Sequence, residues 1–224
     1  MQRRPSQELL DSDAGSPQEV AASLRDLRWF NRHFGGVATS YEMARTAARR
    51  VNASQLSLLE VAAGEGFVQS EVTTRLSQEN INLRVMLLDR APSHLPANRS
   101  MPKLAADALR LPFPDAAFDL VSNSLFAHHL SPGDVTAFLR EALRVCRIAV
   151  LIHDLVRHPL HLAWAYAGVP LYRSRITRND APASVRQAYT PDEMREFCRK
   201  AGASEIEIQR HFLFRMGVIA WKQA

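Results

Sequence analysis

Two carboxylates follow apolar runs in the first half of the chain. Glu60 lies directly before a turn of small residues, and Asp89 ends the apolar run 83–88. A buried strand that breaks into glycines turns tightly into a helix, and the missing side chains let a ligand approach the backbone. A carboxylate at the tip of the next parallel strand can accept two hydrogen bonds from a ribose diol. The spacing indicates a nucleotide pocket, although a glycine-rich turn also serves ordinary strand-to-helix packing.

Three histidines stand where two further strands are expected to end. His128 and His129 follow the run 118–123, and His153, with Asp154 after it, ends the run 148–153. Open parallel sheets bind ligands at the carboxyl edge, where an imidazole suits proton transfer from a substrate hydroxyl. We take His129, His128 and His153 as candidate general bases, against the alternative that they only pack or line the pocket. No histidine or carboxylate repeats at a helix-face spacing, so no metal site is expected.

Composition fits one enzyme-sized domain. The 224 residues are 46% hydrophobic and 23% charged, which is ordinary globular usage. The net charge of +5 would attract phosphates, but the arginines are scattered over many segments and favour a solvated surface. Cys146 and Cys198 lie far apart in stretches expected to be helical, and fit buried thiols in a reducing compartment. With no apolar window of signal-peptide or membrane-spanning length, we expect a cytoplasmic protein without a membrane partner.

The chain divides into three expected parts. Residues 1–15 offer little to bury and predict a disordered leader, and residues 16–52 predict an N-terminal helical lid. That lid would hold one helix from Ser16, a capping-box residue, to the glycines at 35–36, and a second from Ser40 to about residue 51. Residues 53–224 alternate strand and helix, interrupted by a lid insertion at 155–190. Expected strands are 57–62, 83–89, 103–106, 118–123 and 148–153, then an antiparallel pair at 205–209 and 212–221, with helices at 66–78, 132–146 and from Thr190 to near Gly202.

Residues 55–224 resemble the class I S-adenosylmethionine-dependent methyltransferases, of the type that methylates small molecules. Four motifs carry the resemblance in order: Glu60-x-Ala62-x-Gly64-x-Gly66, with alanine for the first glycine; Asp89; Asp107 within 106–113; and Phe118 to Leu130. The family implies an α/β fold with a seven-stranded, mostly parallel sheet, helices on both faces and an antiparallel C-terminal hairpin. It also implies S-adenosylmethionine as cofactor.

The resemblance assigns roles to residues of the cofactor pocket. Glu60 would receive the cofactor's ammonium, Asp89 the ribose hydroxyls and Asp107 the adenine amino group, although Asp107 could also be only an Asx-turn residue. Glu65 in the turn would repel a pyrophosphate but not a cationic cofactor, which disfavours NAD. The expected cofactor-binding set is Tyr41, Glu60, Ala62, Gly64, Gly66, Phe67, Asp89, Arg90, Asp107, Ala108 and Asn123.

Aromatic residues of the two helical additions favour a flat or hydrophobic acceptor. We expect a small aromatic or polyketide-like acceptor, methylated at oxygen. A lid of this kind would exclude water from the methyl-transfer path. Two alternatives stay open: an RNA methyltransferase, suggested by Arg173, Arg175 and Arg178, and a cofactor-binding protein without catalysis. Nucleic acid is disfavoured because no separate RNA-binding module is present. The aromatic residues in question are Trp29, Phe30, Tyr41, Trp164, Tyr166 and Tyr172.

Overall fold

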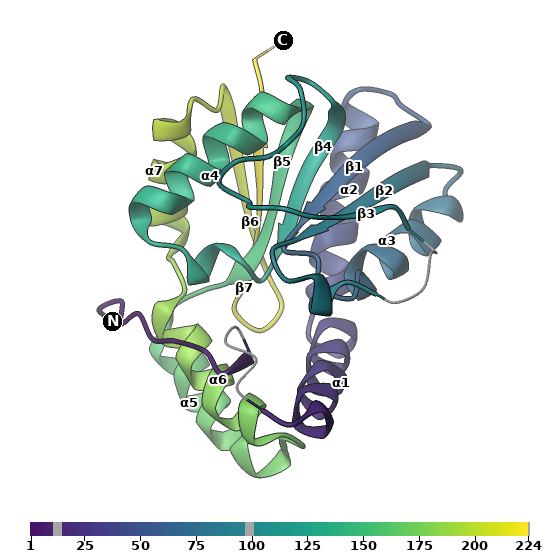
Figure 1. Cartoon of the computed structure of the whole chain (residues 1–224). Coiled ribbons are helices and arrows are strands. Elements are labelled where there is room, and N and C mark those ends of the chain that lie inside the picture. The colour runs from purple at the N-terminus through teal and green to yellow at the C-terminus, as the bar shows by residue number, and fades with distance from the viewer. Residues whose placement is uncertain (11–14, 97–100, 224) are drawn as a thin grey trace.

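A seven-stranded sheet forms the centre of the computed structural model, which describes residues 1–10, 15–96 and 101–223 (Figure 1). Its strand order is β3-β2-β1-β4-β5-β7-β6. Neighbours pair in parallel except β7, which lies antiparallel between β5 and β6. The mostly parallel sheet and the C-terminal hairpin confirm the expected fold class. The strands are β1 (Gln55–Val61), β2 (Asn82–Asp89), β3 (Lys103–Ala105), β4 (Phe118–Ser124), β5 (Cys146–Leu155), β6 (Glu205–His211) and β7 (Arg215–Trp221).

The strand order reverses between β1 and β4, and this reversal positions the site. From β1 the chain continues outward to β2 and β3, whereas β4 and β5 add on its other side. Connections that leave the sheet in opposite directions open a crevice outside the carboxyl ends of the strands. Glu60 and Asp89 both lie at this edge.

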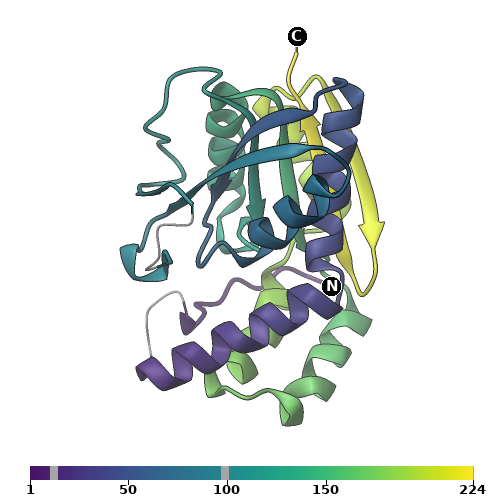
Figure 2. The ribbon, with the colours of Figure 1, turned by 90° about the vertical axis from the view of Figure 1, so that its right-hand side faces the viewer.

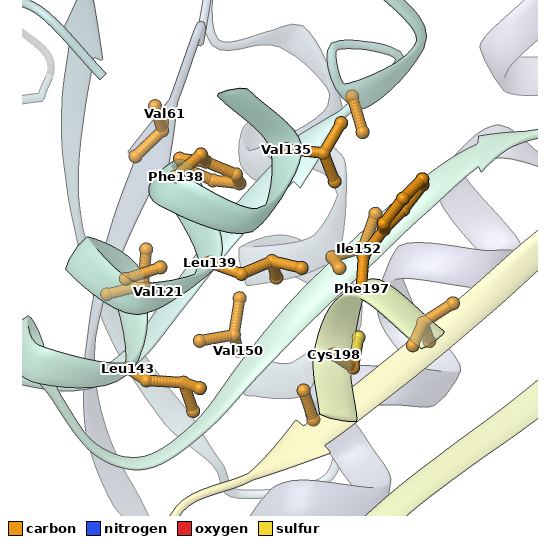
Figure 3. Close-up of a cluster of buried hydrophobic side chains, with 14 of the residues drawn as sticks. Val61, Val121, Val135, Phe138, Leu139, Leu143, Val150, Ile152, Phe197 and Cys198 are labelled. Carbon is orange, nitrogen blue, oxygen red and sulfur yellow. The ribbon is translucent and has the colours of Figure 1, made fainter. Parts of the chain in front are cut away.

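Two helical layers enclose the sheet. On one face α2 (Gly36–Arg50) and α3 (Phe67–Ser77) bury a cluster that includes Leu58, Val72 and Leu87. On the other face α4 (Pro132–Val145) and α7 (Pro191–Ala201) pack Phe138 and Phe197 against apolar side chains of β1, β4 and β5 (Figure 3). Removing these apolar surfaces from water is the main stabilising contribution to the fold, and it fixes the strand ends that carry the polar residues.

A second helical group lies beyond the carboxyl edge of the sheet (Figure 2). It consists of α1 (Pro17–His33), α5 (Pro159–Gly168) and α6 (Arg175–Gln187), with contacts between α1 and α6 and between α5 and α6. Ser16 and Glu19 form the expected capping box of α1. The helix α2 starts at Gly36 rather than Ser40, because the left-handed backbone of Gly35, at φ 83°, ends the turn after α1.

Residues 1–10 correct the expectation of a disordered leader from 1 to 15. The Arg3 side chain donates hydrogen bonds to three main-chain oxygens, those of His128, Leu130 and Gln187, at 2.7–3.0 Å. Glu8 is buried and accepts hydrogen bonds from α6. This segment has few apolar side chains, so its order comes from polar contacts with distant residues. Residues 11–14 lie outside the described part of the chain.

Cys146 begins the strand β5 rather than lying in a helix, whereas Cys198 lies in α7 as expected; both thiols are buried and unpaired. Across residues 1–10, 15–96 and 101–223, no helix has both the length and the apolar character needed to cross a membrane.

Candidate functional site

A cavity of about 1390 Å³ opens at the carboxyl ends of β1, β2 and β4, under the second helical group. Glu60 and Asp89 both line it, as the sequence predicted, and so do His128 and His129 on its other side. The cavity therefore joins the predicted cofactor pocket to the predicted catalytic residues. A single space of this kind has room for a cofactor and a second molecule beside it.

The turn after β1 has the backbone that a close ligand contact needs. Ala62, Gly64 and Gly66 all have positive φ, at 54°, 50° and 71°. A Cβ at Gly66 would lie 2.7 Å from Leu87 Cδ1, so a side chain at this position would force Leu87 to shift. A Cβ at Gly64 would meet nothing within 4 Å and would point into open space. The turn thus leaves room for a ligand at Gly64.

Asp89 is fixed by the same turn. Its Oδ2 accepts a hydrogen bond from the Gly64 amide at 2.9 Å, and its Oδ1 accepts one from the Ala91 amide at 3.0 Å. The side chain is otherwise buried at the cavity wall, at 8% exposure. Each carboxylate oxygen has a further lone pair available, so Asp89 can accept two more hydrogen bonds from a diol.

The Glu60 side chain is buried between β1, to which it belongs, and α3. Its carboxyl accepts a hydrogen bond from Gln69 Nε2 at 2.8 Å and another from the Ser122 hydroxyl. Burial raises the pKa of Glu60 to about 7, although these hydrogen bonds lower it. An acid with this pKa is ready to ionise when a cation arrives. Its neighbour Gln69 was missed by the sequence analysis; it is the polar residue on the sheet-facing side of α3, beside Val68 and Val72.

Further predicted cofactor residues lie along the cavity wall. Phe67, Arg90, Asp107 and Ala108 all line it, together with Ala62. Asp107 Oδ1 also accepts a hydrogen bond from the Leu109 amide at 2.9 Å, so the Asx turn considered as its alternative role is present as well. The turn orients Asp107 without removing it from the cavity.

Two predicted cofactor residues do not line the cavity. Tyr41 lies on the side of α2 that packs against α3, where its hydroxyl hydrogen-bonds to Glu79. Asn123 lies in β4 between Ser122, which reaches Glu60, and Ser124, which lines the cavity. Because side chains alternate along a strand, Asn123 points to the opposite face of the sheet. The structure therefore does not bring Tyr41 or Asn123 to the cavity with the other predicted cofactor residues.

His128 is held between two carboxylates. Its Nδ1 lies 2.6 Å from Asp154 Oδ1, and its Nε2 lies 3.6 Å from Glu8 Oε1. Burial alone would lower the pKa of His128, but the two carboxylates outweigh it and raise the pKa to about 10. An imidazole that keeps both protons at neutral pH has no lone pair for a substrate proton. Both ring nitrogens of His128 thus face carboxylates, which disfavours His128 as a simple general base.

The other two histidines differ from each other. The His129 ring lies 4.1 Å from that of His128, between centroids, and lines the cavity, so its role as a base stays a prediction. His153 is fully buried, and its Nε2 accepts a hydrogen bond from Arg215 at 2.8 Å. Burial lowers the pKa of His153 well below its usual range. Because His153 does not line the cavity, its assignment as a candidate base is wrong.

The outer wall of the cavity is aromatic. Trp29 and Phe30 of α1, Trp164 of α5 and Tyr172 line it, whereas Tyr166 does not. Phe30 and Tyr172 meet edge to face at 5.5 Å between ring centroids. Glu8 and Arg215 also line the cavity, although no sequence pattern predicted either residue. No local pattern could have found Glu8, because its partners lie in distant segments.

Comparison with known proteins agrees with this geometry. Residues 59–151, which run from β1 to β5, match the family model described as a methyltransferase domain. Two curated relatives are demethylmenaquinone methyltransferases, from Roseiflexus sp. (strain RS-1), 32% identical over 116 residues, and from Roseiflexus castenholzii, 30% identical over 116 residues. Each alignment covers 46% of this chain and 48% of the relative. The chain thus spans about half the length of the curated relatives it matches.

Solved structures are similar over nearly the whole chain. The plantazolicin methyltransferase BpumL, in complex with SAH, has a TM-score of 0.71 at 12% identity, covering 96% of this chain and 93% of its own. Human N-acetylserotonin methyltransferase, in complex with SAM, has a TM-score of 0.65 at 12% identity, covering 98% of this chain and 63% of its own. The chain therefore shares its fold with these solved methyltransferase structures, and residues 59–151 are similar to the model of a methyltransferase domain.

Proposed function

We propose that this protein is an S-adenosylmethionine-dependent methyltransferase that acts on a small aromatic or polyketide-like acceptor, at oxygen. The observation that carries the proposal is that Glu60 and Asp89, on neighbouring strands, line one cavity with an open glycine turn between them. The family match and the curated relatives support methyl transfer as the reaction.

The residues of the pocket fit this cofactor. Glu60 would hold the cofactor's ammonium, Asp89 its ribose hydroxyls and Asp107 its adenine amino group, while the space at Gly64 lets the ligand lie against the backbone. When bound, S-adenosylmethionine supplies a methyl group already activated by its sulfonium. The protein has then to align the acceptor oxygen and exclude water.

The aromatic wall supports a flat or apolar acceptor. Trp29, Phe30, Trp164 and Tyr172 offer ring surfaces on the side of the cavity away from the strand ends. Relatives and structural neighbours that are named for demethylmenaquinone, plantazolicin and N-acetylserotonin also act on small molecules. The second helical group would act as the lid over this acceptor.

No observation favours the RNA alternative. Of the three arginines that suggested it, Arg175 lies 3.1 Å from Glu19 and Arg173 lies 3.9 Å from Asp26, so α1 neutralises both. Both ion pairs connect α1 to the insertion that follows β5.

Calorimetric titration with S-adenosylhomocysteine tests the cofactor site. We expect Asp89→Ala to weaken binding about tenfold or more, because the ribose loses its acceptor. Asp89→Asn keeps the size of the side chain and an oxygen for the Gly64 amide, and separates lost ribose binding from a loosened turn. Asp115→Ala, an exposed acid near Arg144, is the matched control. Unchanged affinity in both Asp89 variants would reject the proposal.

Transfer of a labelled methyl group to a panel of phenolic and quinol acceptors then tests catalysis. We expect label in at least one phenolic product. Tight binding of S-adenosylhomocysteine with no transfer to any oxygen, nitrogen or carbon acceptor would favour the non-catalytic alternative instead.

A further inference from the structure

Three possible metal ligands converge on the cavity wall opposite the cofactor pocket. Glu8 comes from the N-terminal segment, and His128 and His129 come from the short 3-10 turn after β4 (Ala127–His129). One ligand atom from each lies within 4.8 Å of the others. No local pattern predicted a metal here, because the carboxylate of this group is far from the histidines along the chain.

The spacing of two of these atoms suits a shared cation better than a direct hydrogen bond. His128 Nε2 and Glu8 Oε1 are 3.6 Å apart, and an N–H···O hydrogen bond spans about 2.7–3.2 Å. Two ligands that each lie about 2.1 Å from a tetrahedral Zn²⁺ are separated by about 3.4 Å. A small shift of either side chain would therefore complete this pair of metal ligands.

A second set of contacts already orients both ligands. Asp154 lies 2.6 Å from His128 Nδ1, which directs Nε2 toward Glu8. Glu8 Oε1 accepts hydrogen bonds from Ser184 Oγ at 2.6 Å and from Gln187 Nε2 at 2.7 Å. Carboxylates behind a histidine and hydrogen bonds to a carboxylate ligand are the usual surroundings of protein metal sites, because they fix the ligand geometry before the ion binds.

We propose that Glu8, His128 and His129 bind one divalent transition metal ion of the Zn²⁺ type. Two imidazoles and one carboxylate leave a coordination position open, and here it would face the cavity. A role for the ion in the reaction rests on the proposed function. In that reaction the open position would hold the acceptor oxygen near the methyl group.

Metal binding by the full chain tests the site without any assay of activity. The chelator-treated protein is titrated with Zn²⁺ by calorimetry, and with Co²⁺ by its visible absorption. We expect one ion per chain in the wild type and in His33→Asn, which removes an exposed histidine of α1 and serves as the matched control. In Glu8→Ala and His129→Ala we expect an affinity lower by about 100-fold or more. Glu8→Gln, which retains an oxygen for Ser184 and Gln187, replaces Glu8→Ala if that variant fails to fold.

Two outcomes would overturn the proposal. One is a wild type that binds neither ion, and the other is equal affinity in the wild type and in the folded Glu8 and His129 variants. S-adenosylhomocysteine binding is measured on the same metal-free sample. If that ligand binds while Zn²⁺ and Co²⁺ do not, the metal site fails and the proposed function stands; if the metals bind while S-adenosylhomocysteine does not, the cofactor assignment fails instead.

Discussion

Glu60 shows how one buried acid links cofactor binding to pH. Burial raises its pKa to about 7, above the ordinary value of 4.5. Between these two values the unfolded chain ionises while the folded one keeps its proton, so the folded state loses stability as the pH rises from about 4.5 to about 7. Below this range the acid is neutral in both states. A cationic ligand would instead stabilise the ionised form.

Glu60→Gln removes this titration and should act in opposite directions on stability and on binding. At pH 8 we expect a free energy of unfolding higher than that of the wild type by up to about 3 kcal/mol, at 1.36 kcal/mol per pKa unit, with little difference near pH 4. S-adenosylhomocysteine should bind the variant more weakly because the ammonium loses its counter-charge. Urea denaturation at both pH values and calorimetry measure the two effects. A stability difference independent of pH would contradict the proposed titration.

The turn from β1 into α3 has a strained backbone that leaves room for a ligand. A left-handed residue with a side chain costs about 1–2 kcal/mol. Gly64 and Gly202 both have positive φ, and a Cβ would meet no atom within 4 Å at either, but only Gly64 lines the cavity. The two positions separate the cost of strain from the loss of ligand space.

Gly64→Ala should therefore fold with a modest loss of stability and bind the cofactor poorly. We expect both Gly64→Ala and Gly202→Ala to lose about 1–2 kcal/mol of unfolding free energy. Only Gly64→Ala should weaken S-adenosylhomocysteine binding, by about tenfold or more, because its methyl group fills ligand space. Chemical denaturation and calorimetry give both numbers. Equal affinity in the two variants would show that the cofactor does not approach this turn.

Elements of the sheet were predictable where the chain itself carries the signal. Apolar runs, glycines and capping residues act over a few positions, and they placed β1, β2 and the turn between β1 and α3 correctly. The orientation of single side chains was harder to predict from the sequence. Asn123 and His153 lie in correctly predicted strands but do not reach the cavity, because strand alternation and pairing with Arg215 decide where they point.

The N-terminal segment, residues 1–10, joins the sheet to the second helical group. Arg3 donates to Gln187 at the end of α6 and to His128 and Leu130 beside β4. Its guanidinium also lies 4.3 Å from the centre of the Tyr189 ring. Contacts between residues this far apart in sequence form only in the folded protein. Local sequence patterns do not show them, and they therefore predicted that residues 1–10 belong to a disordered leader.

Arg3→Ala should loosen this junction while leaving the sheet intact. Three main-chain oxygens lose a charged donor, which costs about 1–3 kcal/mol in unfolding free energy because only part of the bonding is replaced by water. Arg4→Ala is the matched control: the exposed Arg4 contributes its backbone amide, at 3.1 Å from Arg186 O, and this bond survives the substitution.

Amide hydrogen exchange should rise in α6 and at residues 127–130 in Arg3→Ala alone, while β1 and β4 keep their protection. Faster exchange spread evenly over the sheet, or an equal effect of both variants, would show that Arg3 is not the link between the two parts. Because α6 also holds Glu8 through Ser184 and Gln187, a selective effect would make the N-terminal segment part of the cavity's architecture rather than an appendage to it.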